Sequence, residues 1–393
     1  MEADGLTGLA ESNLHPDLLH NPKIRIHELP PSPRRPGSVP FLIFGPWKVL
    51  VQLYHLTCVL CYGLKPAQWL LVQNPPSIPT LFVSALVCSL RNTRLMIDWH
   101  NYGWTILAGT RGAGHPLVYL SKIYECWFGK LGDYNLTVTE AMGKQLRQPP
   151  YSIKSPMLTV HDRPADIFQP ISTTGSGKKE ALTRIFPDNK LIPSVLNGDT
   201  RLIVSSTSWT PDEDFSLLLD ALVQYANNKT DSKNPPSPVL AIITGKGPQK
   251  EMYLKKIAAL QESGSLPNVA VETAFLSFPD YAALLACADL GICLHKSSSG
   301  VDLPMKVVDM FGAGLPVAAY SAYESFGELV REGVNGRGFE TPGELAGILG
   351  HLLSAKGKGE LETLRKGAVK EGSRRWDEEW DATVGPVLLG LGT

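Results

Sequence analysis

The sequence predicts an α/β fold in which two doubly wound domains, each built on a mostly parallel sheet, face each other across a cleft. Two observations lead to this prediction. Short apolar segments alternate with helical ones in two series, a pattern typical of parallel sheets covered by helices. A stretch rich in proline, serine, threonine and glycine, residues 151–193, separates the series. The 393 residues are enough for two domains with full cores.

The first series predicts an incomplete domain over residues 41–165. Its expected strands are residues 69–72, 94–97 and 135–138, and its expected helices are residues 81–90 and 117–130. Residues 74–79, Asn-Pro-Pro-Ser-Ile-Pro, predict a turn. In the stretch that follows, only residues 157–160 look like a strand, so residues 166–198 are expected to form a linker and a loop.

The second series predicts a domain over residues 199–365. Its expected strands are residues 201–205, 239–244, 269–272, 290–294 and 317–319. Its expected helices are residues 215–227, 249–262, 279–286, 305–312 and 326–332. Residues 366–393 predict a C-terminal helix and tail packed on a domain surface, because Trp376 and Trp380 lie one helical turn apart.

The first 40 residues, rich in proline, predict an irregular segment with one strand at residues 23–27. An uncharged run then covers residues 49–64, between Lys48 and Lys65. A spanning helix needs about 20 apolar residues, so this run is too short on its own. Two alternatives remain: a buried helix, or a helix that lies in a membrane surface.

The composition is that of an ordinary globular protein, with 43% hydrophobic and 19% charged residues. The net charge of −1 argues against a broad basic surface, so nucleic acid is not expected as a partner. Six cysteines lie in apolar stretches, and only Cys58 and Cys61 have CxxC spacing. No second pair accompanies them, so we expect buried reduced thiols, as in a cytosol-facing protein.

A candidate anion site lies where residues 297–300, Ser-Ser-Ser-Gly, lead from a strand into a helix. Small residues let backbone amides approach a ligand, and the helix dipole attracts phosphate at this end. Pro304 suits the first helical position. Lys306 in the first turn opposes the dipole unless an anion is bound, and Asp309 lies three residues on, on the same face. Cation and carboxylate together match a diphosphate followed by a ribose diol.

Three further segments lie at strand ends of the second domain. Ser206, Thr207 and Ser208 are expected to cap the facing helix, to touch phosphate, or both. Lys246 is flanked by Gly245 and a second glycine, which predicts either a close approach to the nucleotide or a plain turn. For His295 we expect either a phosphate contact or a structural hydrogen bond.

The acidic run Asp212-Glu-Asp214 has the spacing of a metal-binding motif. It follows Thr-Pro and precedes a helix, where carboxylates complement the positive end of the dipole. We therefore expect helix capping and no metal site.

The motif Pro-x-Lys-x-x-Asp-Met-Phe-Gly-x-Gly-Leu-Pro-Val, residues 304–317, resembles the donor-site signature of GT-B glycosyltransferases. Among them, the ordered set of motifs resembles family 33 over about residues 40–380. These further motifs are residues 72–79, 97–101 (Ile-Asp-Trp-His-Asn), 136–142, 162–164, 206–214 (Ser-Thr-Ser-Trp-Thr-Pro-Asp-Glu-Asp), 244–248 and 297–306.

The resemblance implies transfer of mannose from GDP-mannose to dolichyl-diphosphate-chitobiose, which forms the first β1,4-linked mannose of the N-glycan precursor. This reaction takes place on the cytosolic face of the endoplasmic reticulum membrane and uses no cofactor. The implied partners are both substrates, the membrane surface, and complexes with later mannosyltransferases. Two alternatives stay open: another nucleotide-sugar lipid glycosyltransferase, or an inactive, truncated form that binds nucleotide or acts as a scaffold.

The resemblance also implies roles for individual residues. Lys306 binds the donor diphosphate with Ser298, Ser299 and Gly300, and Asp309 accepts hydrogen bonds from the ribose. Family members begin with a membrane anchor and a first strand followed by a glycine-rich loop. Neither is visible before residue 23, so the chain is expected to start near the family's second strand.

Such a reaction turns an α-linked donor into a β-linked product and therefore needs a base for the acceptor hydroxyl. Asp98 and His100 end a predicted strand of the first domain, and their period-two spacing allows them to face the same side. Either Asp98 is the base or it orients His100, and the remaining alternative is a turn histidine with no catalytic role. Glu140 and Asp162 are weaker candidates. Many retaining relatives have a second acidic residue eight positions before the helix carboxylate, where this chain has Val301, and this argues against a retaining mechanism. Asp302 follows one position later and is expected to cap the helix instead.

The lipid acceptor requires the site to approach a bilayer. The segment from Phe41 to Leu56 carries Trp47 and Tyr54 among apolar residues, so we expect it to dock on the membrane interface.

Overall fold

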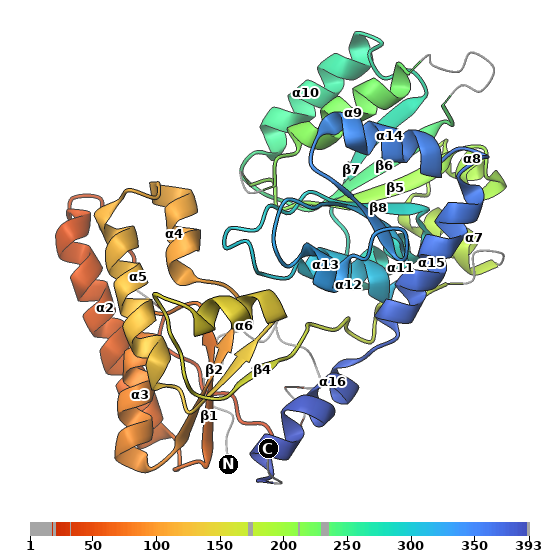
Figure 1. Cartoon of the computed structure of the whole chain (residues 1–393). Coiled ribbons are helices and arrows are strands. Elements are labelled where there is room, and N and C mark those ends of the chain that lie inside the picture. Colours follow the sequence, from red (N-terminus) through yellow and green to blue (C-terminus); the bar gives the residue numbers. More distant parts are fainter. Residues whose placement is uncertain are drawn as a thin grey trace.

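The computed structural model describes residues 18, 21–31, 33–171, 176–210, 213–228 and 236–390. Two parallel sheets form two domains (Figure 1). The first sheet has four strands in the order β1-β2-β3-β4, and the second has six in the order β10-β9-β8-β5-β6-β7. Every strand pair within the two sheets is parallel. The predicted α/β class with two parallel-sheet domains is confirmed.

The first sheet contains all the strands predicted for it. They are β1 (Trp69–Asn74), β2 (Arg94–Trp99), β3 (Tyr134–Thr137) and β4 (Met157–Thr159). The two predicted helices are α3 (Thr80–Arg91) and α5 (Pro116–Phe128), which a 3-10 turn extends over Gly129–Leu131. Two short helices were not predicted, α4 (Gly103–Arg111) and α6 (Glu140–Arg147). Each has about two turns, too few for a periodic pattern to stand out.

The two faces of the first sheet have different covers. Leu95 and Ile97 point toward the helices and share a core with Leu81, whereas Met96 between them belongs to a second core with Val384. This second core is completed by the C-terminal tail, α16 (Trp376–Thr383) and α17 (Gly385–Leu388). The tail thus leaves the second domain and packs under the first sheet, as the predicted tail helix required (Figure 1).

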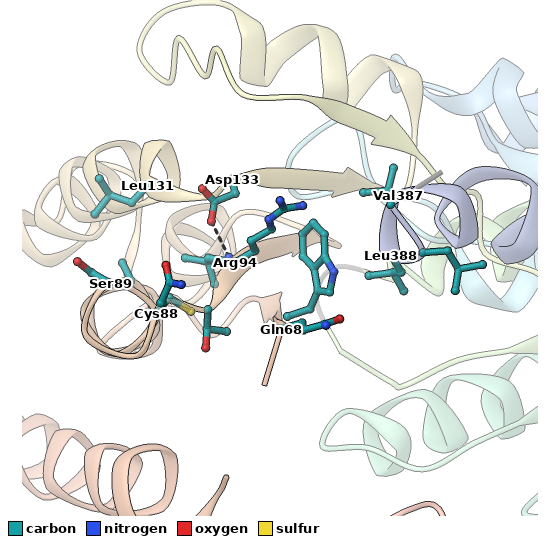
Figure 2. Close-up of a pocket in the computed structure, with 15 residues that line it drawn as sticks. Gln68, Cys88, Ser89, Arg94, Leu131, Asp133, Val387 and Leu388 are labelled. Carbon is teal, nitrogen blue, oxygen red and sulfur yellow. Dashed lines mark hydrogen bonds between the residues drawn. The ribbon is translucent and has the colours of Figure 1, made fainter. Parts of the chain in front are cut away.

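A cavity of about 860 Å³ lies between the first sheet and this tail. Figure 2 shows Arg94 and Asp133 on one side of it and Val387 and Leu388 on the other. The Asp133 carboxylate accepts a hydrogen bond from the Leu95 amide at 2.7 Å. The cavity lies at the amino ends of β1 and β2, the edge opposite to the one where parallel sheets bind ligands.

The apolar segment before β1 forms α2 (Phe41–Cys58), continued by a π-helical turn (Val59–Gly63). Residues 43–63 are one helix that is long and apolar enough to cross a membrane, and none of it is buried. The buried alternative is therefore wrong. The length estimate was also wrong, because it stopped at Lys48, which the helix includes. Cys58 and Cys61 lie here and are half-buried, while all six thiols are free.

Residues 23–27 form no strand, so this prediction was wrong. Five alternating residues need a neighbouring strand for their backbone groups. In the described part of the chain no sheet extends to them.

The second sheet contains the five predicted strands and one more. They are β5 (Arg201–Ser206), β6 (Val239–Thr244), β7 (Val269–Ala274), β8 (Leu290–Cys293), β9 (Val317–Tyr320) and β10 (Gly336–Phe339). The sequence of β10, Gly-Arg-Gly-Phe, has two glycines and low strand propensity, so it was not predicted.

The predicted helices of the second domain are also present. They are α9 (Ser216–Ala226), α10 (Lys250–Glu262), α11 (Phe278–Cys287), α12 (Met305–Gly312) and α13 (Phe326–Leu329). The last is shorter than predicted. Two later helices, α14 (Pro342–Leu352) and α15 (Lys358–Gly372), were not predicted.

The stretch predicted as linker and loop contains two helices, α7 (Ser176–Ile185) and α8 (Ile192–Asn197). They bury Leu182, Ile192 and Val195 in the large core, and α7 packs against α11. An irregular linker was therefore the wrong prediction. Prolines and glycines around these helices hide the periodicity, but tertiary packing stabilises them.

Arg163 fastens the end of the first domain to the C-terminal helices. Its side chain is only 3% exposed and makes ion pairs at 2.9 Å with Glu371 and with Glu379. A buried guanidinium that satisfies two carboxylates fixes the path of the chain, because each partner would otherwise be left charged and poorly solvated.

Substitution Arg163→Ala should lower the free energy of unfolding by about 3 kcal/mol, since it leaves two partly buried carboxylates without their common partner. Equilibrium denaturation with guanidinium measures the change. The control is Arg331→Ala, which removes a 49% exposed arginine that pairs with the same Glu371 and should cost about 1 kcal/mol or less. Equal losses in both variants would show that Arg163 does not fasten the domains.

Candidate functional site

The carboxyl ends of the two sheets meet through Asn101, which follows β2. Its Nδ2 donates to Ser298 Oγ at 3.2 Å and to Asp302 Oδ2 at 3.1 Å. The Thr139 hydroxyl donates across the same junction to the carbonyl of Val301. The end of the first sheet therefore touches the serine loop directly, and this places the candidate catalytic pair beside the candidate anion loop.

The serine loop is held by its own hydroxyl groups. The Gly300 amide donates to Ser297 Oγ at 2.7 Å, and the Val301 amide to Ser299 Oγ at 3.4 Å. Gly300 has a φ of +78°, which a glycine adopts without strain. Ser298 Oγ also lies 3.3 Å from the Thr105 hydroxyl, so this serine faces the first domain.

The start of α12 differs from the prediction in two ways. Pro304 is the residue before the first helical position rather than the first helical residue, and no side chain caps the helix. Asp302 therefore does not cap it, and that prediction was wrong. Its Oδ2 instead lies 3.1 Å from His295 Nε2 as well as from Asn101, while Oδ1 is buried with no partner among the described residues. The amides at the start of α12 therefore receive no hydrogen bond from the Asp302 side chain.

Lys306 makes an ion pair with Glu213, a carboxylate buried next to β5. The same carboxylate accepts hydrogen bonds from Thr207 Oγ1 at 3.0 Å and from the Ser208 amide at 2.5 Å. Lys306 Nζ also lies 3.5 Å from Ser208 Oγ. An ammonium, a hydroxyl and an amide thus converge on one carboxylate, and this arrangement is an anion-binding environment.

The predicted role of the acidic run needs correction. Helix α9 begins at Ser216, and Glu213 does not interact with its start but holds the loop after β5. Asp214 does cap the helix, since Oδ1 accepts from the Ser216 amide at 3.2 Å. Asp212 lies outside the described residues. No three His, Cys, Asp or Glu side chains of the described residues form a group that could hold a metal.

The side chains of Ser206, at the end of β5, and of Thr207 and Ser208, which follow it, do not cap α9, so that expectation was wrong. Ser206 and Thr207 are buried, and Ser206 Oγ lies 2.9 Å from the Tyr281 hydroxyl. Ser208 is exposed and lies next to Lys306. Phosphate contact for this loop stays a prediction, with Ser208 as its accessible member.

The loop after β6 passes very close to the loop after β5. A Cβ on Gly245 would lie 1.9 Å from the Thr207 carbonyl oxygen, and one on Gly247 would lie 1.7 Å from that of Ser208. The two glycines are therefore required for this packing, whatever else the loop binds. Lys246 between them is exposed, with Nζ 5.2 Å from the centre of the Phe275 ring.

Asp309 lies on α12 one turn after Lys306 and is half-buried. Burial raises the pKa of its carboxyl from 3.8 to about 7. The negative charge of Asp309 contributes to the raised pKa of the Tyr281 hydroxyl. This hydroxyl is the hydrogen-bond partner of Ser206 at the end of β5.

Asp98 and His100 form the pair expected from their spacing, with His100 Nε2 2.9 Å from Asp98 Oδ2. Burial acts to lower the pKa of His100, but the hydrogen bond to Asp98 and the charges of Asp98 and Asp162 outweigh it, so the pKa is raised. The pKa of Asp162 is itself raised by burial. Glu140 is exposed, and its backbone amide donates to Glu328 of the second domain.

His295 makes the structural hydrogen bond that was one of its two alternatives, to Asp302. A phosphate contact by this residue stays a prediction. Three residues of the site were missed as site residues: Asn101 and Asp302 at the junction of the domains, and Glu213 within the second domain. Asn101 and Asp302 each follow a predicted site residue closely in the sequence. Glu213 lies between two aspartates, and the whole run was assigned to helix capping.

The comparisons with known proteins define the class. Residues 199–355 match the family described as Glycosyl transferases group 1. The fold is similar to HepE of Anabaena in complex with UDP, with a TM-score of 0.62 and 16% identity over 90% of this chain and 85% of that one. It is also similar to a sucrose-phosphate synthase of Thermosynechococcus elongatus, with a TM-score of 0.62 and 13% identity over 88% and 78% of the two chains. The protein is a glycosyltransferase of the GT-B fold.

Relatives with higher identity define the family. One from Arthroderma benhamiae, named chitobiosyldiphosphodolichol beta-mannosyltransferase, is 49% identical, and the alignment covers 99% of this chain and 87% of that one. Proteins of the same name from Mus musculus and Homo sapiens are each 38% identical over 98% of this chain, and the alignments cover 82% and 86% of their lengths. The chain belongs to the chitobiosyldiphosphodolichol beta-mannosyltransferase family and is a hexosyltransferase.

The raised pKa of Asp309 predicts a dependence of stability on pH. The folded chain keeps this proton up to about pH 7, whereas the unfolded chain loses it near 3.8. The stabilising effect of the bound proton is full below about pH 4 and is lost as the pH rises through 7, by less than about 1.4 kcal/mol per unit.

Substitution Asp309→Asn should therefore raise the stability of the ligand-free protein at pH 8 and leave it almost unchanged at pH 4. Urea denaturation at both pH values measures the difference. Asp381→Asn on the exposed side of α16 is the control and should change neither value. An Asp309→Asn variant as stable as the parent at pH 8 would contradict burial as the cause of the shift.

Proposed function

We propose that this enzyme transfers mannose from GDP-mannose to dolichyl-diphosphate-chitobiose with inversion, forming the first β1,4-linked mannose of the N-glycan precursor. One observation carries the proposal: an anion-binding loop in the second domain lies beside a histidine–aspartate pair in the first. A transferase of this kind needs a diphosphate leaving group on one side of a cleft and a base for the acceptor on the other.

The donor half of the proposal rests on Lys306. In the ligand-free chain its ammonium neutralises Glu213, and with donor bound it stabilises the charge that develops on the departing GDP. Ser208, Ser298 and Ser299, together with the turn at Gly300, provide hydroxyls and amides around the phosphates. Asp309 accepts hydrogen bonds from the ribose diol. No cofactor enters this scheme, because the leaving-group charge is assigned to protein groups.

The acceptor half rests on His100. The attacking hydroxyl of chitobiose loses its proton to the imidazole as it forms the new bond to the anomeric carbon of mannose and GDP departs from the opposite face. Asp98 holds the ring through Nε2 and stabilises its protonated form. Between the two earlier alternatives, this favours Asp98 as the orienting residue, because its carboxylate already bonds the imidazole.

The lipid part of the acceptor requires a membrane, and the unburied helix at residues 43–63 is suited to one. We place the enzyme on the cytosolic face of the endoplasmic reticulum membrane. Its neighbours there would include the mannosyltransferases that act on its product.

The substrates are tested with purified protein, a phytanyl-diphosphate-chitobiose acceptor, and GDP-mannose or UDP-sugars as donors. Mass spectrometry should show addition of one hexose with GDP-mannose only, and a β-mannosidase should remove it. Substitution Lys306→Ala should lower kcat by about 10²- to 10³-fold, because it removes the charge that stabilises GDP as it leaves.

The matched control is Lys255→Ala, which removes an exposed lysine from α10 and should leave kcat unchanged. Transfer from a UDP-sugar would overturn the donor assignment. Binding of GDP without any turnover would overturn the enzymatic role and favour a scaffold.

The base is tested by the pH dependence of kcat/KM. His100→Gln should lower it by about 10²- to 10⁴-fold, since general base catalysis contributes this much. Asp98→Asn removes the hydrogen bond and charge that raise the pKa of His100, so the acidic limb should move to lower pH at reduced rate. The exposed His27→Gln serves as control. If Asp98→Asn abolishes the acidic limb altogether, Asp98 is the base instead.

A further inference from the structure

The helical layer on the outer face of the first domain has an unusual charge composition. Residues 41–132 contain only two acidic residues, Asp98 and Glu125. Glu125 is fully buried and Asp98 is paired with His100, so α2, α3, α4 and α5 expose no carboxylate. The same stretch contains seven basic residues, of which Arg94 lies on β2 at the cavity beside the C-terminal tail. The other six lie on or next to the helical layer: Lys48, Lys65, Arg91, Arg111, Lys122 and Lys130.

Two of these helices also expose apolar stripes. On α2 the exposed residues recur at intervals of four, three and four, which aligns them on one side of a helix: Ile43, Trp47, Leu50 and Tyr54. On α5 they fall within one arc of the helix: Tyr119, Leu120, Ile123 and Trp127. Trp47 is 58% exposed and Trp127 is 72% exposed. Large apolar side chains this exposed mark a contact surface when they gather on neighbouring elements.

The stripes belong to one continuous layer. Helix α3 contacts both α2 and α5, and α4 packs on α5. Figure 1 shows α2 and α5 at the edge of the first domain that points away from the second domain. Leu90 on α3 and Ile106 on α4 add further exposed apolar side chains to the layer.

We propose that α2, α3, α4 and α5 together form a docking face for a bilayer that contains anionic phospholipids. This rests on the proposed function in that the acceptor is a lipid. Tryptophan and tyrosine beside aliphatic residues suit the boundary between headgroups and acyl chains. Basic residues with no exposed carboxylate among them are attracted to anionic headgroups. A transmembrane segment would need α2 alone, whereas this face recruits α5 as a second contact.

Helix α4 connects this layer to the active site. Helix α4 begins at Gly103, two residues after Asn101, which touches the serine loop of the second domain. The junction of the two domains is therefore tied directly to the docked helices.

The experiment measures cosedimentation of the full chain with vesicles of phosphatidylcholine alone and of phosphatidylcholine with phosphatidylinositol. The apolar variant is Leu120→Glu with Trp127→Glu on α5. Its matched control is Met252→Glu with Leu254→Glu, two exposed apolar residues of α10 in the second domain. The α5 variant should bind both vesicles about tenfold more weakly than the parent, and the control should match the parent.

The charge variant is Lys65→Glu with Lys130→Glu, with Lys255→Glu and Lys366→Glu as a control of equal charge change on the second domain. The charge variant should lose the preference for phosphatidylinositol vesicles, and its control should keep it. Parent-like vesicle binding by the α5 variant would overturn the proposal. Equal losses in variant and control would also overturn it, and so would a parent protein that binds no vesicles.

Transfer to a short-chain acceptor in detergent separates this proposal from the proposed function. The docking variants should retain this activity, which also shows that they fold, and lose transfer to a long-chain acceptor in vesicles. A parent enzyme inactive in detergent but bound to vesicles would refute the proposed function and support the docking face. If the docking variants are active in detergent and also transfer normally to the long-chain acceptor in vesicles, the docking face is refuted and the proposed function is not.

Discussion

The hydrogen bonds from Asn101 to Ser298 and Asp302 are the interaction on which the site depends. Asn101 is itself fixed on the first domain, because its carbonyl accepts from Asn74 at the end of β1. His100 is the residue before it. The Asn101 side chain thus links the residue that follows the imidazole to the serine loop, and the Thr139 hydroxyl adds a second contact across the same junction.

Glu213 explains how the anion loop exists without a ligand. A lysine in the first turn of a helix opposes the helix dipole, and a nearby anion removes this conflict. In the ligand-free chain the Glu213 carboxylate has this role, and it also satisfies the Ser208 amide. A bound diphosphate must share Lys306 with this carboxylate, so the loop is preorganised for negative charge but does not hold Lys306 unpaired.

Much of this arrangement was predictable from sequence, and the failures have identifiable physical causes. Apolar strands such as β6 and longer helices such as α9 appear where predicted. Short helices such as α8 depend on tertiary packing, which no local pattern reports. The Asp98–His100 pair follows from period-two spacing, but Glu213 pairs with a residue 93 positions away, and only the fold reveals such a contact. Asp302 was assigned to the nearest helix, although it bonds across the junction.

The electrostatics of α12 link donor binding to proton release. Burial raises the pKa of Asp309, while the ammonium of Lys306 one turn earlier forms an ion pair with Glu213. Near neutral pH a substantial fraction of Asp309 is therefore protonated in the ligand-free chain. A ribose diol donates to a carboxylate and favours its charged form, so binding lowers this pKa and expels a proton. The carboxyl group proposed to bind the ribose is thus partly protonated in the ligand-free chain. It becomes fully charged only when the ribose hydroxyls donate hydrogen bonds to it.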